Sequence, residues 1–171
     1  LLSLEGDDHL RLRRLLGPAF RSRAIEAMRP QFQHLAGELI DGFAARGRVE
    51  LVGEFAEPYA ARVLCLLLGL PDEEWAQVAH WADDLGKSFG INLRHDLPRI
   101  EAALEGLTGY VDEVVADRRA RPRDDLVSTL VTAQDNETLD ERELSVGLVF
   151  LAFAGMETTR NQLGLALQTF L

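Results

Sequence analysis

Apolar residues recur through most of this chain at intervals of three and four positions, which places them on one face of an α-helix. Phe32, Leu35, Leu39 and Phe43 show this spacing. The pattern predicts helices over residues 8–20, 30–46, 55–68, 72–88, 98–121, 124–133 and 140–171. Residues 48–52, Arg-Val-Glu-Leu-Val, alternate instead and predict one minor strand. We therefore expect a mainly helical, all-α fold of about seven helices in one domain.

The last predicted helix carries an unusual polar interruption. Residues 148–171 are apolar except around Ala-Gly-Met-Glu-Thr-Thr at 154–159. Gly155 removes a side chain and lets a flat partner approach the backbone, at a cost of about 1 kcal/mol in helix propensity. The hydroxyl of Thr158 can bond to the carbonyl four residues earlier, which competes with the helix ladder. Together with Glu157, that hydroxyl forms a notch that can relay protons to a bound group.

A second group of polar residues lies near the start of the chain. His9 and Arg13 are four residues apart and share one helical face, where they can bind a carboxylate or a phosphate. Simpler explanations remain open for both groups. His9 and Arg13 can be a solvated helix start, and Glu157 can simply pair with Arg160 beside a tolerated glycine.

The net charge and the cysteine content argue against some classes of partner and some cellular compartments. The net charge of −10 argues against a nucleic-acid partner. The one cysteine, Cys65, lies in an apolar run and is expected to be a small buried side chain. No disulfide framework is available, which suits a reducing compartment, and we expect a cytoplasmic protein. No apolar run reaches the ~20 residues of a spanning helix, so we expect no membrane partner.

Two segments together resemble the cytochrome P-450 haem-thiolate monooxygenases. They are Asp-Asp-His-Leu-Arg-Leu-Arg-Arg-Leu-Leu-Gly-Pro-Ala-Phe at 7–20 and Ala-Gly-Met-Glu-Thr-Thr at 154–159. The resemblance covers the chain from that family's C helix to its I helix, in order. His9 favours the soluble bacterial type. By this resemblance residues 1–171 are the central part of a single cytochrome P-450 domain, truncated at both ends.

The resemblance implies a role for each site residue. His9 and Arg13 match positions that bind the propionates of haem b, and Ala154 and Gly155 match the pair that lies against the porphyrin. Glu157 and Thr158 match the acid and the alcohol that deliver protons to dioxygen, with Thr158 beside the cofactor.

The resemblance also assigns residues that contact the substrate, and they lie on the same predicted helix. Phe150, Phe153 and Ala154 would face a small hydrophobic organic substrate. The resemblance further implies that O2 is the oxidant, and that electrons come from a ferredoxin or flavodoxin and its reductase. Arg11 and Arg14 are the candidates to contact that acidic partner.

The family's axial cysteine lies beyond this chain, so no metal ligand is expected here. Cys65 falls in the E-helix region and is not that ligand. We expect the complete protein to be a monooxygenase, and this segment alone to be inactive. The alternative is a non-enzymatic helical module that binds a ligand, such as the regulatory half of a transcription regulator.

Overall fold

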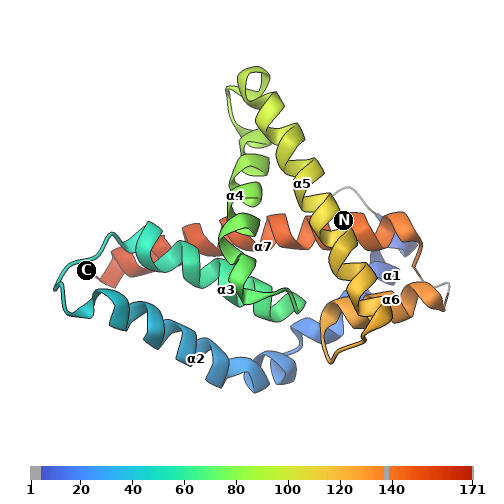
Figure 1. The fold of residues 1–171 in the computed structure, drawn as a ribbon, viewed down its shortest axis with the longest axis horizontal. Helices are drawn as coiled ribbons and strands as arrows, with labels where there is room; N and C mark the ends of the chain where they lie inside the picture. The colour runs from blue at the N-terminus through green and yellow to red at the C-terminus, as the bar shows by residue number, and fades with distance from the viewer. Residues whose placement is uncertain (1–4, 137–138, 171) are drawn as a thin grey trace.

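The computed structural model describes residues 5–136 and 139–170, apart from the side chain of Ala19. Within these ranges the chain forms seven α-helices, as the spacing of apolar residues predicts, and no strand (Figure 1). The α-helices are α1 Gly6–Leu16, α2 Ser22–Ala44, α3 Glu57–Leu68, α4 Trp75–Gly86, α5 Leu93–Ala120, α6 Leu126–Asp135 and α7 Glu141–Phe170. Short 3-10 segments lie at η1 Gly17–Phe20, η3 Asp72–Glu74 and η4 Lys87–Phe89, and a π-helical turn at η2 Val52–Ala56.

The strand predicted at residues 48–52 is wrong in the part of the chain that the structure describes. Residues 48–50 have no regular structure, and helical conformation begins at Leu51. The side chain of Glu50 accepts hydrogen bonds from the backbone N–H of Val52, at 3.2 Å, and of Gly53, at 2.6 Å. A strand needs a neighbouring strand, whereas this carboxylate satisfies the first donors of a helix directly.

Two helices begin earlier than their prolines suggest. Pro30 and Pro98 were expected to open helices, but Pro30 lies inside α2 and Pro98 inside α5. An internal proline leaves one carbonyl without its helical partner. Both prolines are exposed, so water can reach the carbonyls that they leave unpaired.

The core is built around α3 and α7. α3 is deeply buried, since Ala60, Ala61, Cys65 and Leu68 are each at most 1% exposed. In Figure 1, α7 runs the length of the molecule with α3 beside it, while α4 and α5 cross α7 and project as an arm. This crossing determines which side chains meet the polar interruption of α7.

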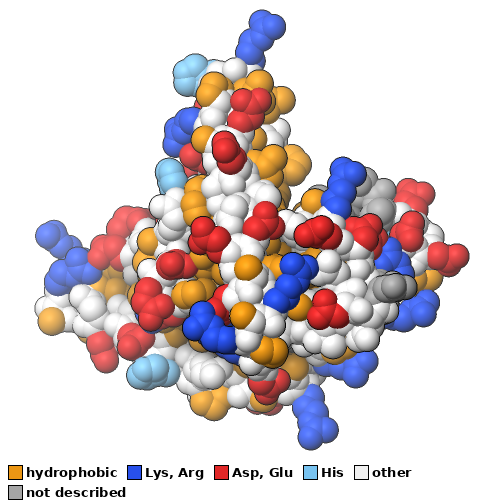
Figure 2. Space-filling view, turned by 45° about the vertical axis from the view of Figure 1, so that its right-hand side comes forward, with side chains coloured by type: hydrophobic (Ala, Val, Ile, Leu, Met, Phe, Trp, Pro, Cys, Tyr) orange, Lys and Arg blue, Asp and Glu red, His pale blue; other side chains and the backbone are white. Residues whose placement is uncertain are grey.

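Large apolar side chains remain exposed on this arm and on the free face of α7. Figure 2 shows hydrophobic side chains along the projecting arm. The exposed set on these elements comprises Phe89, Ile91, Leu93, Leu97, Leu104, Val146, Leu165 and Phe170. Among the described residues, no helix is both long enough and apolar enough to cross a membrane.

Candidate functional site

The polar interruption of α7 has the local geometry that its residue types predict. The hydroxyl of Thr158 donates a hydrogen bond of 2.7 Å to the carbonyl oxygen of Ala154. Because that hydroxyl gives its proton to the helix's own backbone, its oxygen lone pairs remain able to accept a proton or a hydrogen bond. Thr158 is exposed, so a bound molecule or water can reach it.

One face of α7 is buried and the opposite face is open. Met156 is 3% exposed and Ala152 is 1% exposed, and both face the core. Phe150, Ala154 and Thr158 follow one another at intervals of four, and none of them is buried. The open face therefore presents a small side chain and a hydroxyl along one stripe.

Gly155 lies at the contact between α7 and α3. A Cβ added to Gly155 would come within 2.9 Å of Cδ1 of Leu64, closer than real Cβ contacts allow. Its missing side chain is therefore explained by helix packing within the described chain. A contact of the Gly155 backbone with a cofactor stays a prediction.

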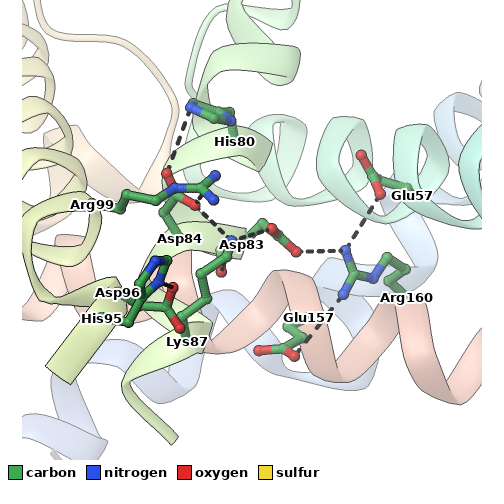
Figure 3. A network of polar contacts seen from close by, with 10 residues as sticks. All are labelled: Glu57, His80, Asp83, Asp84, Lys87, His95, Asp96, Arg99, Glu157 and Arg160. Atoms are coloured by element: carbon green, nitrogen blue, oxygen red, sulfur yellow. Dashed lines mark hydrogen bonds and ion pairs between the residues drawn. The ribbon is translucent and has the colours of Figure 1, made fainter. Parts of the chain in front are cut away.

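Glu157 points toward α4. Its carboxylate occupies the space beside Gly86, where an added Cβ would lie 2.5 Å from Oε2 of Glu157. Arg160, one turn further along α7, lies with its guanidinium 4.0 Å from that carboxylate (Figure 3). The pairing of Glu157 with Arg160, left open by the sequence, is thus present.

Arg160 also joins α7 to α3 and α4. Its guanidinium donates to Glu57 at 3.3 Å and to Asp83 at 3.4 Å. The hydrogen bond from Lys87 to Asp83, with further help from Arg160, lowers the pKa of Asp83 below its ordinary value despite partial burial. Glu157 therefore lies at one edge of a charged cluster that ties three helices together.

The same cluster continues to the base of the arm. Lys87 bonds to the buried carboxylate of Asp84 at 2.6 Å, and Arg99 of α5 reaches Asp84 at 2.9 Å. Burial opposes the charged form of Asp84, but the hydrogen bond and charge of Lys87, with the charge of Arg99, lower its pKa. The arm is thus held to the site by ion pairs.

Phe153 has an aromatic partner that the sequence could not assign. Its ring stacks on Phe89 of η4, with centroids 6.0 Å apart and planes 10° apart. Phe89 comes from the connection between α4 and α5, which lies between the helices that the sequence predicts at 72–88 and 98–121.

The N-terminal pair is on α1, away from the notch. His9 is partly buried and Arg13 is exposed. A bidentate bond from Arg11 to Glu143, with Nη1 at 3.0 Å, links α1 to α7. Glu143 precedes Thr158 by about four helical turns, or roughly 22 Å. The structure does not bring His9 and Arg13 into contact with Thr158.

The bond between Arg11 and Glu143 corrects one prediction. Arg11 was a candidate to contact an acidic partner protein, but its guanidinium is used within the chain. Arg14 is exposed and lines a surface hollow of about 340 Å³ together with Arg13 and Arg21. Exposed arginines therefore remain at this end of the molecule.

Cys65 is a core residue, as expected. It is fully buried, and burial raises the pKa of its thiol to about 12, with Asp72 and Glu74 adding to the shift. A thiol held in its neutral form is a poor metal ligand. Among the described residues no cluster of three or more metal-binding side chains occurs.

The described residues fit a flat cofactor that carries carboxylates. The open stripe of α7 offers the small Ala154 for close approach and the Thr158 hydroxyl beside it. Arg13 is exposed and can donate two parallel hydrogen bonds to a carboxylate. Each group thus suits one part of such a cofactor, and contact of a single cofactor with both groups stays a prediction.

Comparisons with known proteins show that this chain is similar to bacterial cytochrome P450s. No family model matches. It is 36% identical over 165 residues to the mycinamicin IV hydroxylase/epoxidase of Micromonospora griseorubida, covering 95% of this chain and 41% of that protein. It is 34% identical to the polyketide biosynthesis cytochrome P450 PksS of Bacillus subtilis, covering 96% of this chain and 40% of the relative. The chain thus spans about two fifths of the length of these relatives.

Solved structures agree with the sequence comparison. The structure of CalO2 matches with a TM-score of 0.92 at 32% identity, over 98% of this chain and 43% of that one. The LnmA cytochrome P450 hydroxylase of Streptomyces atroolivaceus matches with a TM-score of 0.85 at 34% identity, over 99% and 43%. The match extends from α1 to α7, so both candidate groups lie within it.

Proposed function

This chain belongs to the cytochrome P450 family by sequence and by fold, and from that premise we propose that it is the central part of a haem-dependent monooxygenase domain. The reaction inserts one oxygen atom of O2 into an organic substrate and reduces the other to water, using two electrons and two protons. The observation that carries the proposal is the bond from Thr158 to Ala154 on an open stripe of α7, with Glu157 beside it.

The cofactor in this proposal is haem b, and it supplies the oxygen-activating chemistry when bound. Ala154 lies against its face, where a larger side chain would hold the ring away, and Gly155 is the neighbouring position on α7. His9 and Arg13 hold its carboxylates. Both residues are at least partly exposed on α1, which supports this assignment.

Glu157 and Thr158 handle protons. The Thr158 oxygen can accept a proton while its own hydrogen bonds to Ala154, and it can pass a proton on when the hydroxyl rotates away from that carbonyl. Glu157 is the source in this proposal, because it is the acid that precedes Thr158 on α7 and part of its side chain is exposed, so it can take up protons from water. Loss of the Glu157 carboxylate or of the Thr158 hydroxyl would interrupt the path that delivers protons for oxygen reduction.

The substrate in this proposal is an apolar organic molecule that contacts Phe150, Phe153 and Ala154. The stack of Phe153 on Phe89 adds the base of the arm to the same apolar surface. Relatives are named for mycinamicin IV, vitamin D3 and 6-deoxyerythronolide B. Those names support a substrate with a large apolar skeleton.

The electron donor is a ferredoxin or a flavodoxin, supplied by its reductase in the cytoplasm. Arg14 and Arg21 line one surface hollow, and a positive surface in a chain of net charge −10 suits an acidic partner. One similar solved protein, P450BioI, was crystallised with an acyl carrier protein. An acidic carrier protein would recognise the same arginines.

The experiment is a spectrum of the natural protein that contains these residues, loaded with haem. Its reduced complex with carbon monoxide should show the absorption band from which the family takes its name. Turnover with a reductase system should convert an apolar substrate into a product that carries oxygen from O2. A protein that binds haem without this band would contradict the proposal.

A further inference from the structure

We propose that Arg160 and Gly86 are positioning residues that hold the Glu157 carboxylate between α4 and Thr158. This inference rests on the proposed function, because it assigns Glu157 as the proton source. Neither residue belongs to the stripe of α7 that faces the cofactor. Both act on the reaction only through Glu157.

Gly86 provides the space that Glu157 occupies. The carboxylate oxygen Oε2 lies 2.5 Å from the point where a Cβ on residue 86 would stand. Gly86 is the last residue of α4 and its φ is −58°, so backbone conformation does not require glycine there. A side chain on residue 86 would therefore require the Glu157 carboxylate to move from its present position.

Arg160 provides the positive charge that attracts the Glu157 carboxylate. Its side chain is 18% exposed, and three carboxylates surround its guanidinium, those of Glu57, Asp83 and Glu157. Glu57 and Asp83 are at 3.3 and 3.4 Å, while Glu157 is at 4.0 Å (Figure 3). Glu157 is the most weakly held of the three acids.

The unequal distances from Arg160 to its three carboxylates affect the ability of Glu157 to transfer a proton. A carboxylate in a tight bidentate pair with arginine would stay ionised and fixed, which suits a structural ion pair better than a proton relay. Here Glu57 and Asp83 take the shorter contacts, and the Glu157 carboxylate is attracted at 4.0 Å without a tight bidentate pair. Proton transfer to Thr158 then requires a rotation of the Glu157 side chain, because adjacent positions on a helix do not face each other.

Arg160 also makes this arrangement depend on the packing of helices. Its three partners come from α3, α4 and α7, and Asp83 also binds Lys87 at the base of the arm. A shift of α4 moves Gly86 and Asp83 together. The position of Glu157 is therefore set by α4 as well as by its own helix.

The test compares four variants of the haem-loaded natural protein. Arg160→Gln removes the charge, Arg160→Lys keeps it, and Gly86→Ala fills the notch. We expect Arg160→Gln and Gly86→Ala to lower the fraction of consumed O2 recovered as product by about tenfold, with hydrogen peroxide accounting for the rest. Arg160→Lys should recover part of that loss, and substrate affinity from spectral titration should stay unchanged. Arg142→Gln, an exposed arginine on the same helix, is the matched control and should be neutral.

Crystal structures of the same variants give a readout that does not depend on turnover. In Gly86→Ala and Arg160→Gln the Glu157 carboxylate should lie away from its position beside residue 86. Gly109→Ala, a helical glycine with nothing within 4 Å of an added Cβ, is the matched control. An unmoved carboxylate, or full product yield in Arg160→Gln, would overturn the inference.

Failure of the proposed function is recognised separately. A wild-type protein without the carbon monoxide band refutes the monooxygenase and this inference with it. A wild-type protein that is active, with variants that are equally well coupled, refutes only the positioning roles.

Discussion

Phe89 and Phe153 stack face to face with ring centroids 6.0 Å apart, although they belong to η4 and to the middle of α7. Phe89 is 74% exposed, so most of its side chain is open to solvent. Its aromatic contact in the described structure is the stack on Phe153. The pair connects η4, which joins α4 to α5, with α7. It therefore joins the base of the projecting arm to the apolar side of the proposed site.

The first prediction concerns this pair. Phe89→Ala should weaken substrate binding by about tenfold, because an aromatic contact is worth about 0.5–1.5 kcal/mol beyond its buried area. Stability should change by less than about 0.5 kcal/mol, since the ring is mostly exposed. A spectral titration with substrate measures the first and thermal unfolding the second. Ile91→Ala, on the same connection, is the control and should leave affinity unchanged.

The second prediction concerns the hydroxyl of Thr158. Thr158→Ala should retain substrate binding but release most of the consumed oxygen as hydrogen peroxide, because the proton-accepting oxygen is lost. Thr158→Ser keeps the bond to the Ala154 carbonyl and should keep most of the product yield. The ratio of product to oxygen consumed measures this. Coupled turnover in the alanine variant would remove Thr158 from the mechanism.

The third prediction concerns a buried arginine that supports α5. Arg118 is 2% exposed and donates to Asp125, at 2.6 Å, and to the carbonyl of Gly69, at 2.5 Å. Arg118→Ala should cost about 3–5 kcal/mol of unfolding free energy, because it leaves the carboxylate of Asp125 without its cation. Denaturant unfolding measures the loss. The exposed neighbour Arg119→Ala should cost less than about 1 kcal/mol.

The fourth prediction concerns Cys65 and pH. Burial raises the pKa of its thiol to about 12, above the value of about 8.5 for an unfolded cysteine. Above pH 8.5 the unfolded state loses this proton while the folded state keeps it, so stability should fall as pH rises from about 8.5 toward 12. Unfolding measured across that range should show a shallower fall in Cys65→Ala.

A reactivity assay checks the same residue independently. In the folded protein an alkylating reagent at neutral pH should leave Cys65 unmodified, because the thiol is both buried and protonated. After unfolding it should react fully. Rapid modification of the native protein would show that the thiol is accessible, contrary to the structure.

The features that the sequence predicted correctly are local ones. The apolar spacing is read along single helices, and it predicted the seven helices; the apolar run around Cys65 predicted the burial of that side chain. The bond from Thr158 to Ala154 joins residues four apart, so helix geometry alone brings them together. The resemblance to P450s likewise rests on two short segments and their separation, which need no coordinates.

Contacts between distant segments were decided only by the tertiary structure. Nothing local to Arg11 indicates Glu143 as its partner, and nothing local to Phe153 indicates Phe89. The alternating residues 48–52 could not reveal that a glutamate caps a helix where a strand was expected. Gly155 was assigned to a cofactor face, yet its missing side chain also serves the packing of Leu64.

For this chain, sequence by itself determined the helical class, the family and the residue types of the proton-handling notch, because each is encoded within a few turns of helix. Tertiary structure decided how Glu157 is held. That carboxylate lies against Gly86 of α4 and near Arg160, which is shared with α3 and α4. Such an arrangement depends on the angle at which three helices cross, and no pattern along one helix specifies that angle.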